Sequence, residues 1–90
     1  MQEQSMTAQE MAWIRKQFGL SQRQLASILG VQISTLKRIE LQTAPMKQMY
    51  TAIMERELGA KWFSMFRREY RQWLKRSEQE EQQARARRLG

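Results

Sequence analysis

The sequence predicts an all-α fold of five helices, and three observations lead to this prediction. The 90 residues contain one proline and four glycines, and these helix-breaking residues divide the chain into segments of helix length, not strand length. Within the segments, apolar residues recur every three or four positions, as they do on one face of an α-helix. Two segments also begin with a Ser or Thr that is followed three positions later by Gln or Glu, which is the sequence pattern of a helix capping box.

The two capping boxes predict where the first two helices begin. In the first box we expect the Thr7 hydroxyl to accept a hydrogen bond from the Glu10 amide, and the Glu10 carboxylate to accept one from the Thr7 amide. This helix ends near Gly19, which tolerates the left-handed conformation of a helix C-terminus. Ser21 and Gln24 form the second box. The inward-facing residues of the two helices are Met11, Ile14, Phe18, Leu25, Ile28 and Leu29.

Two further helices follow in the first part of the chain. We expect a third helix over Ile33–Leu41, with Leu36 and Ile39 facing inward. Pro45 suits the first turn of a fourth helix, because its missing N–H leaves no hydrogen bond unmade there. This fourth helix is expected to continue to Gly59.

A fifth helix is predicted from Lys61, because no helix-breaking residue follows until Gly90. Its first half is rich in aromatic residues, whereas residues 75–88 are mostly charged or polar. The expected organisation is a disordered N-terminus (1–6), a four-helix domain (7–59), an aromatic helix (60–76) and a charged tail that is either helical or frayed (77–90).

The composition excludes several kinds of chemistry. The chain has no His and no Cys, and all nine of its acidic residues are Glu. Thiol nucleophiles, disulfides, zinc sites built from His and Cys, and a Ser-His-Asp triad are therefore excluded. No second catalytic group can be placed beside a Glu by spacing, so we expect no enzymatic activity, no metal and no cofactor.

The charge balance indicates a polyanionic partner. Sixteen Lys and Arg residues against nine Glu give a net charge of +7, for which nucleic acid is the usual partner. An anionic membrane surface and a merely soluble surface are the alternatives. No apolar run is long enough to span a membrane, and residues 1–10 lack the apolar region of a signal peptide. We therefore expect no membrane insertion and a cytoplasmic protein.

The most informative pattern is that of a helix-turn-helix. This motif needs a small residue where two helices cross, a turn residue that tolerates positive φ, and apolar residues that hold the second helix against the first. Ala26, Gly30, Leu36 and Ile39 occupy these positions. On these residues, the segment GLSQRQLASILGVQISTLKRIE resembles the lambda-repressor and Cro family of DNA-binding domains, also called the XRE family. The resemblance implies a four-helix lambda-repressor-like domain over residues 7–58, which the long C-terminal helix extends.

The resemblance also implies structural and phosphate-contacting roles. Arg15 and Glu40 match an Arg–Glu pair of the family, so we expect them to form a structural salt bridge. Ser21 matches the residue that caps the second helix, and Gln22 matches a residue that hydrogen-bonds a DNA phosphate. The full set of expected phosphate contacts is Ser21, Gln22, Arg23, Thr43, Lys47 and Gln48.

The third helix would be the recognition helix. The resemblance assigns base contacts to Gln32, Ile33, Ser34 and Arg38, and we add Lys37 because it is near enough to reach a base or a phosphate. Arg38 can donate two hydrogen bonds to guanine O6 and N7, Gln32 can pair with adenine, and Ile33 can pack on a thymine methyl group. Gln32 departs from the Ser, Thr or Asp that often caps this helix in the family, so we expect its first turn to be held less firmly.

The aromatic residues of the fifth helix predict a further interface. Five of the eight aromatic residues fall between Trp62 and Trp73, which is more apolar surface than a terminal helix leaves in water. We expect a two-fold symmetric dimer interface here, formed by Trp62, Phe63, Phe66, Tyr70, Trp73 and Leu74. One alternative is an intramolecular core with Trp13, Tyr50, Ile53 and Met54. The other is base stacking of single-stranded nucleic acid beside Arg67, Arg68 and Arg71.

Together these patterns predict a small homodimeric repressor that binds a pseudo-palindromic operator in double-stranded DNA. The resemblance alone implies that it blocks its own or a neighbouring promoter, in a prokaryotic, phage or plasmid context. One alternative is an antitoxin or a phage- or plasmid-borne adaptor whose aromatic helix binds a protein partner. Another is a non-specific nucleic-acid binder that acts through its basic tail. No small-molecule ligand is indicated.

Overall fold

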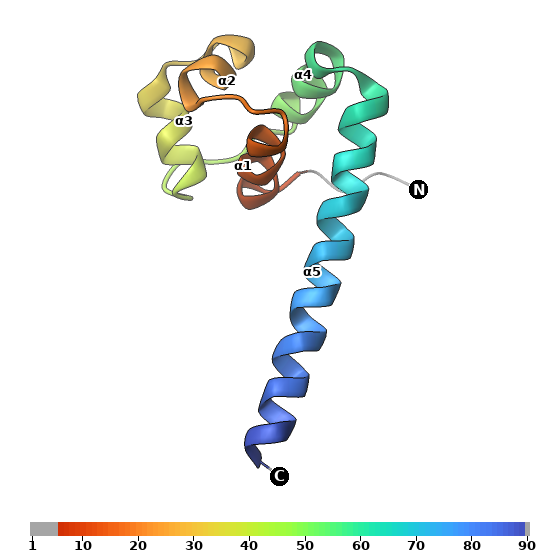
Figure 1. Ribbon diagram of the computed structural model, residues 1–90. Helices are drawn as coiled ribbons and strands as arrows, with labels where there is room; N and C mark the ends of the chain where they lie inside the picture. Colours follow the sequence, from red (N-terminus) through yellow and green to blue (C-terminus); the bar gives the residue numbers. More distant parts are fainter. Residues whose placement is uncertain (1–5, 90) are drawn as a thin grey trace.

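The computed structural model describes residues 6–89, which form five helices and no strand. The helices are α1 (Ala8–Gln17), α2 (Gln22–Leu29), α3 (Ile33–Glu40), α4 (Gln48–Leu58) and α5 (Ala60–Leu89). Figure 1 shows α1 to α4 gathered into one domain, while α5 runs past it and projects far beyond it. The prediction of an all-α fold with a long C-terminal helix is confirmed.

The capping box of α2 forms as the sequence predicts. The Ser21 Oγ accepts a hydrogen bond from the Gln24 amide at 3.1 Å, and the Gln24 Oε1 accepts one from the Ser21 amide at 2.8 Å. At the other end of α2, Gly30 adopts a φ of 71°, which is the left-handed conformation that a side chain would disfavour. The chain therefore turns sharply from α2 into α3, as a helix-turn-helix requires.

The capping box predicted for α1 is only half formed. The Thr7 Oγ1 accepts a hydrogen bond from the Glu10 amide at 3.1 Å, but the Glu10 carboxylate accepts a hydrogen bond from Arg67 of α5 at 2.9 Å. A buried carboxylate gains more from a charged partner than from a backbone amide. The prediction that the Glu10 carboxylate accepts a hydrogen bond from the Thr7 amide is therefore wrong.

The fourth helix begins later than predicted. Because α4 starts at Gln48, Pro45 lies in the linker before it and not in its first turn. The linker instead folds back on the end of α3, where the amides of Thr43 and Ala44 both donate to the Arg38 carbonyl at 2.9 and 3.2 Å. Gln42 takes a positive φ of 64° to make this turn.

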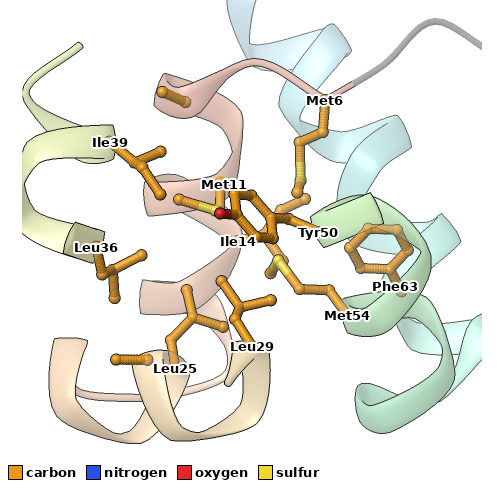
Figure 2. Packing of buried hydrophobic residues seen from close by; sticks show 12 residues of the cluster. Met6, Met11, Ile14, Leu25, Leu29, Leu36, Ile39, Tyr50, Met54 and Phe63 are labelled. Atoms are coloured by element: carbon orange, nitrogen blue, oxygen red, sulfur yellow. The ribbon is translucent and has the colours of Figure 1, made fainter. Parts of the chain in front are cut away.

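The core lies where α1, α2, α3 and α4 meet, and α5 contributes to its edge. Figure 2 shows Met11 and Ile14 of α1 at the centre, with Leu36 and Met54 directed toward them from α3 and α4. Met6 is 1% exposed and belongs to the same cluster. The prediction of disorder for residues 1–6 is therefore wrong for Met6, because its buried side chain holds the backbone in place. Residues 1–5 lie outside the described residues.

The two halves of α5 have different surroundings. The first half packs against α1 and α4 and buries Phe63 and Tyr70. The second half projects away from the domain (Figure 1), and its side chains from 78 to 88 are all exposed. The charged tail is therefore helical as far as Leu89. Within residues 6–89, no helix is both long and apolar enough to cross a membrane.

Candidate nucleic-acid interface

The recognition helix α3 presents a clear outward face. Leu36 and Ile39 are 0% and 1% exposed, so they anchor one side of the helix in the core. The opposite side exposes Ser34, Lys37 and Arg38 to solvent. Neither Lys37 nor Arg38 forms an ion pair with any residue that the structure describes. The two cationic groups are therefore available to an anionic or hydrogen-bonding partner such as a DNA groove.

The start of α3 agrees with the sequence prediction at Gln32 but not at Ile33. Gln32 is the N-cap residue, and its side chain makes no capping hydrogen bond. Its amide group is exposed and lies next to the outward face. Ile33 is half-buried and packs against the core cluster, so the expectation that it lies on the outside is wrong in part. An apolar side chain at the first turn gains more from the core than from water.

A hydrogen-bonded network holds α3 in place. The Arg15 Nε and Nη2 donate to the Glu40 Oε2 and Oε1 at 2.9 and 3.2 Å, and the Arg15 Nη1 donates to the Leu20 carbonyl at 2.9 Å. The Gln22 Nε2 also donates to the Glu40 Oε1, at 3.0 Å. The predicted salt bridge between Arg15 and Glu40 is confirmed. It joins α1 to the end of α3, and Gln22 adds α2 to the same network.

The predicted phosphate contacts lie at two places in the chain. Ser21, Gln22 and Arg23 lie at the N-terminus of α2, whose unpaired backbone amides favour an anion. One N–H of the Gln22 side-chain amide donates to Glu40. A contact from Gln22 to a phosphate would therefore use the second N–H of this amide or another rotamer of the side chain. The second group lies at the linker and the start of α4 and consists of Thr43, Lys47 and Gln48, all of them exposed. The Thr43 hydroxyl donates to the Arg38 carbonyl at 3.2 Å.

A groove beside α3 contains a residue that the sequence analysis missed. It has a volume of about 400 Å³, and its lining includes Lys16, Gln22, Lys37 and Leu41. Lys16 belongs to the last turn of α1 and is exposed, which places a third cationic side chain beside the candidate DNA-contacting residues. The only signal for it in the sequence was its position next to Arg15.

Some aromatic side chains of α5 are buried in the core, and others are exposed to solvent. Phe63 and Tyr70 are 1% and 6% exposed. Phe66 is half-buried and packs edge-on against Phe18, with ring centroids 4.9 Å apart. The prediction that these three residues form a dimer interface is therefore wrong, because the domain already covers them. The exposed members of the predicted set are Trp62, Trp73 and Leu74, at 56%, 48% and 38%.

A buried ion pair joins this helix to the domain. The Arg67 Nε donates to the Glu10 Oε2 at 2.9 Å, and the two side chains are only 6% and 8% exposed. Arg67 is therefore buried against the domain and is not exposed to contact single-stranded nucleic acid. Its position between Phe63 and Tyr70, on the face that packs against the domain, was the sequence signal for burial.

Among residues 6–89, no cluster of three or more acidic side chains could hold a metal ion.

Comparison with known proteins agrees with this geometry. A family model described as helix-turn-helix matches residues 3–55, which is more than half of the chain and includes α1, α2, α3 and most of α4. No curated protein matches the chain, and no solved structure matches it. The matched segment contains both the sharp turn at Gly30 and the exposed face of α3. The chain therefore belongs to the XRE family of helix-turn-helix proteins, the DNA-binding transcriptional regulators that resemble lambda repressor and Cro.

Proposed function

We propose that this protein is a sequence-specific transcriptional repressor that inserts α3 into the major groove of its operator. The observation that carries the proposal is the exposed pair Lys37 and Arg38 on a helix whose other face is locked into the core by Leu36 and Ile39. A recognition helix has to present base-reading side chains from a fixed position. The Arg15–Glu40 pair supplies that fixed position.

Each outward side chain of α3 contacts a different part of the operator. Arg38 donates two hydrogen bonds to the O6 and N7 atoms of a guanine, and Gln32 pairs with an adenine. Ser34 hydrogen-bonds a base edge, the exposed part of Ile33 contacts a thymine methyl group, and Lys37 reaches a base or a phosphate. The phosphate contacts from α2 and from the start of α4 set the position of α3 in the groove.

A dimer would place two copies of α3 in successive major grooves, about 34 Å apart, on a pseudo-palindromic operator. The exposed apolar side chains of α5 support dimer formation, because Trp62 and Trp73 leave about half of their surface in water. The operator would overlap the protein's own or a neighbouring promoter, and bound dimer would block polymerase by occupancy.

The test is to select binding sites from randomised duplexes at physiological salt and to sequence the retained DNA. We expect an inverted repeat whose half-sites contain a guanine read by Arg38. Arg38→Ala should then lose binding to the selected site while its circular dichroism spectrum stays that of the wild type. Arg56→Ala is the matched control, because Arg56 is an exposed cation on α4. If no sequence is enriched, direct recognition by α3 is wrong.

A second candidate function is that of an adaptor that binds another protein, and the exposed Trp62, Trp73 and Leu74 favour it. In that case the helix-turn-helix would serve as a scaffold. Arg38→Ala separates the two functions, because it would leave binding to every duplex unchanged if the adaptor function holds.

A further inference from the structure

The outward side of α5 carries a basic stripe, and we propose that this stripe binds the phosphate backbone of a second DNA segment while α3 holds the operator. The basic stripe consists of Lys61, Ser64, Arg68, Arg71 and Lys75. These residues are spaced three, four, three and four positions apart, so they share one side of the helix, and all of them are exposed. The inference rests on the proposed function for the first DNA segment and adds a separate surface for the second.

The basic stripe lies on the side of α5 that is turned away from the domain. The opposite side of α5 contacts α1 through the Arg67–Glu10 ion pair. Tyr70 on that side also packs against Trp13 of α1, with ring centroids 5.5 Å apart. A helix turns by about 100° per residue, so Arg68 lies about 160° round α5 from Tyr70. The cations of the stripe therefore point away from α1 and into solvent.

No acidic residue interrupts the basic stripe. Glu69 lies about 100° round the helix from Arg68, and Glu78 follows only after Lys75, where the stripe ends. No cation of the stripe forms an ion pair with any residue that the structure describes. Four unpaired cations spread over about 21 Å of helix suit an extended polyanion such as the DNA backbone.

The basic stripe is hollowed where α4 meets α5. A cavity of about 150 Å³ lies there, and its lining includes Ser64, Arg68 and Arg71 from the stripe and Glu55 from α4. Glu55 is half-buried, and the two exposed guanidinium groups outnumber its carboxylate. Guanidinium and hydroxyl groups are the side-chain donors that proteins direct at DNA phosphates. The cavity therefore offers a place for one phosphate group within the stripe.

Helix α1 separates the basic stripe from the recognition helix. Arg15 of α1 pairs with Glu40 of α3, and Glu10 of α1 pairs with Arg67 of α5. The two α1 residues lie about 140° apart round that helix, and Figure 1 shows α3 and α5 on opposite sides of α1. Duplex DNA stays nearly straight over about 500 Å, whereas the protein is 51 Å long. A duplex held by α3 would therefore not reach the stripe, and the protein would bridge two segments.

The packing of α5 favours DNA over an anionic membrane as the partner of the basic stripe. A helix that lies in a membrane surface has to bury an apolar face beside its basic one. In α5 the apolar face packs against α1 and α4, where Phe63 and Tyr70 are buried. Binding to the DNA backbone needs no apolar face, because it depends on the cations alone.

The test measures whether protein bound to its operator captures a second duplex. The selected operator is fixed to a surface and saturated with protein, and a fluorescent duplex without the operator is then titrated. We expect the wild type to capture this duplex. The combined change Lys61→Gln, Arg68→Gln and Lys75→Gln should weaken capture about tenfold or more and reduce its slope of log K against log salt by about 3.

Two controls accompany this variant. Its binding to the operator should stay within about twofold of the wild type, because charges on the far side of the domain are screened at physiological salt. Arg56→Gln should leave capture unchanged, because it removes an exposed cation of α4 that lies outside the basic stripe. Circular dichroism verifies that each variant keeps its helices.

Four results would overturn the proposal. The first is loaded protein that captures no second duplex, and the second is a triple variant that captures it as tightly as the wild type. The third is a triple variant that loses operator binding as much as capture, since the stripe would then contact the operator itself. The fourth is binding to phosphatidylserine vesicles that the triple change abolishes while capture persists, which would assign the stripe to a membrane.

These results separate the basic stripe from recognition by α3. Failure of capture on a well-loaded operator contradicts the stripe alone. If no operator is enriched, the proposed function is wrong, and the salt slope on an unselected duplex still tests the stripe. We then expect the triple change to reduce that slope by about 3, and an unchanged slope would overturn the proposal.

Discussion

Arg15 and Glu40 form a bidentate ion pair, with N–O distances of 2.9 and 3.2 Å, that ties the first helix of the domain to the last turn of the recognition helix. Gln22 donates to the same carboxylate and brings α2 into the network. The position of the exposed face of α3 therefore depends on three side chains that do not themselves lie on it. A change in this network should act first on folding, and on DNA binding only as a consequence.

We expect Glu40→Ala to lower the free energy of unfolding by about 3 kcal/mol, because it leaves the Arg15 guanidinium, whose side chain is only 12% exposed, without its charge partner. Urea denaturation measures this loss. Glu57→Ala is the control, since its ion pair with Arg56 is exposed and should contribute less than about 1 kcal/mol. Equal losses in the two variants would show that the Arg15–Glu40 pair does not hold the domain.

The Glu10–Arg67 pair should stabilise the junction of α1 and α5. We expect Glu10→Gln and Arg67→Met each to destabilise the protein, and the double variant to lose about 2 kcal/mol less than the sum of the two single losses. The reason is that each single change leaves the other charged group buried at 6% to 8% exposure. Urea denaturation of the wild type and the three variants measures the coupling, and additive losses would contradict it.

Stability should fall at high pH through Tyr70. Burial, and to a lesser extent the Glu10 carboxylate, raise the pKa of Tyr70 above its ordinary value of 10.0. The folded state then holds the phenol proton more tightly than the unfolded chain does. The resulting stabilisation is complete below pH 10 and is lost as the pH rises through the raised pKa.

Tyr70→Phe cannot lose this proton, so its free energy of unfolding should decline less steeply above pH 10 than that of the wild type. Urea denaturation at a series of pH values from about 9 to 11 measures the two slopes. Parallel curves would mean that the titration of Tyr70 does not affect folding.

The three arginines of the tail should add affinity without sequence preference. We expect the combined change Arg85→Gln, Arg87→Gln and Arg88→Gln to reduce the slope of log K against log salt by about 2 to 3 on an unselected duplex. The preference for the selected operator over this duplex should remain, because it depends on α3. Fluorescence anisotropy at several salt concentrations measures both quantities. An unchanged slope would show that the tail does not contact the phosphate backbone.

The features that the sequence predicted correctly depend on short stretches of chain or on a recognisable motif. The capping box at Ser21 and the left-handed turn at Gly30 involve residues within a few positions of one another. The Arg15–Glu40 pair is distant in sequence, and the resemblance to the XRE family located it. The outward position of Lys37 and Arg38 followed from helical periodicity, once Leu36 and Ile39 were assigned to the core.

The features that it did not predict depend on which helices pack together. Glu10 satisfied the pattern of a capping box, but its neighbour in space is Arg67, 57 residues away. Pro45 suits the start of a helix, yet it lies in the linker, because the amides of Thr43 and Ala44 donate to the Arg38 carbonyl. In each case a local preference of the chain was outweighed by a contact that formed only in the folded domain.

The sequence by itself determined the number of helices, the turn between α2 and α3 and the outward position of Lys37 and Arg38 on the recognition helix, because periodicity, capping and backbone freedom act over a few residues. The tertiary structure decided which aromatic residues of α5 remain exposed. All six predicted interface residues are apolar or aromatic, and only the packing of α5 on α1 and α4 separates the buried Phe63 and Tyr70 from the exposed Trp62 and Trp73. Burial depends on the surface that a neighbouring helix presents, and no local pattern contains that information.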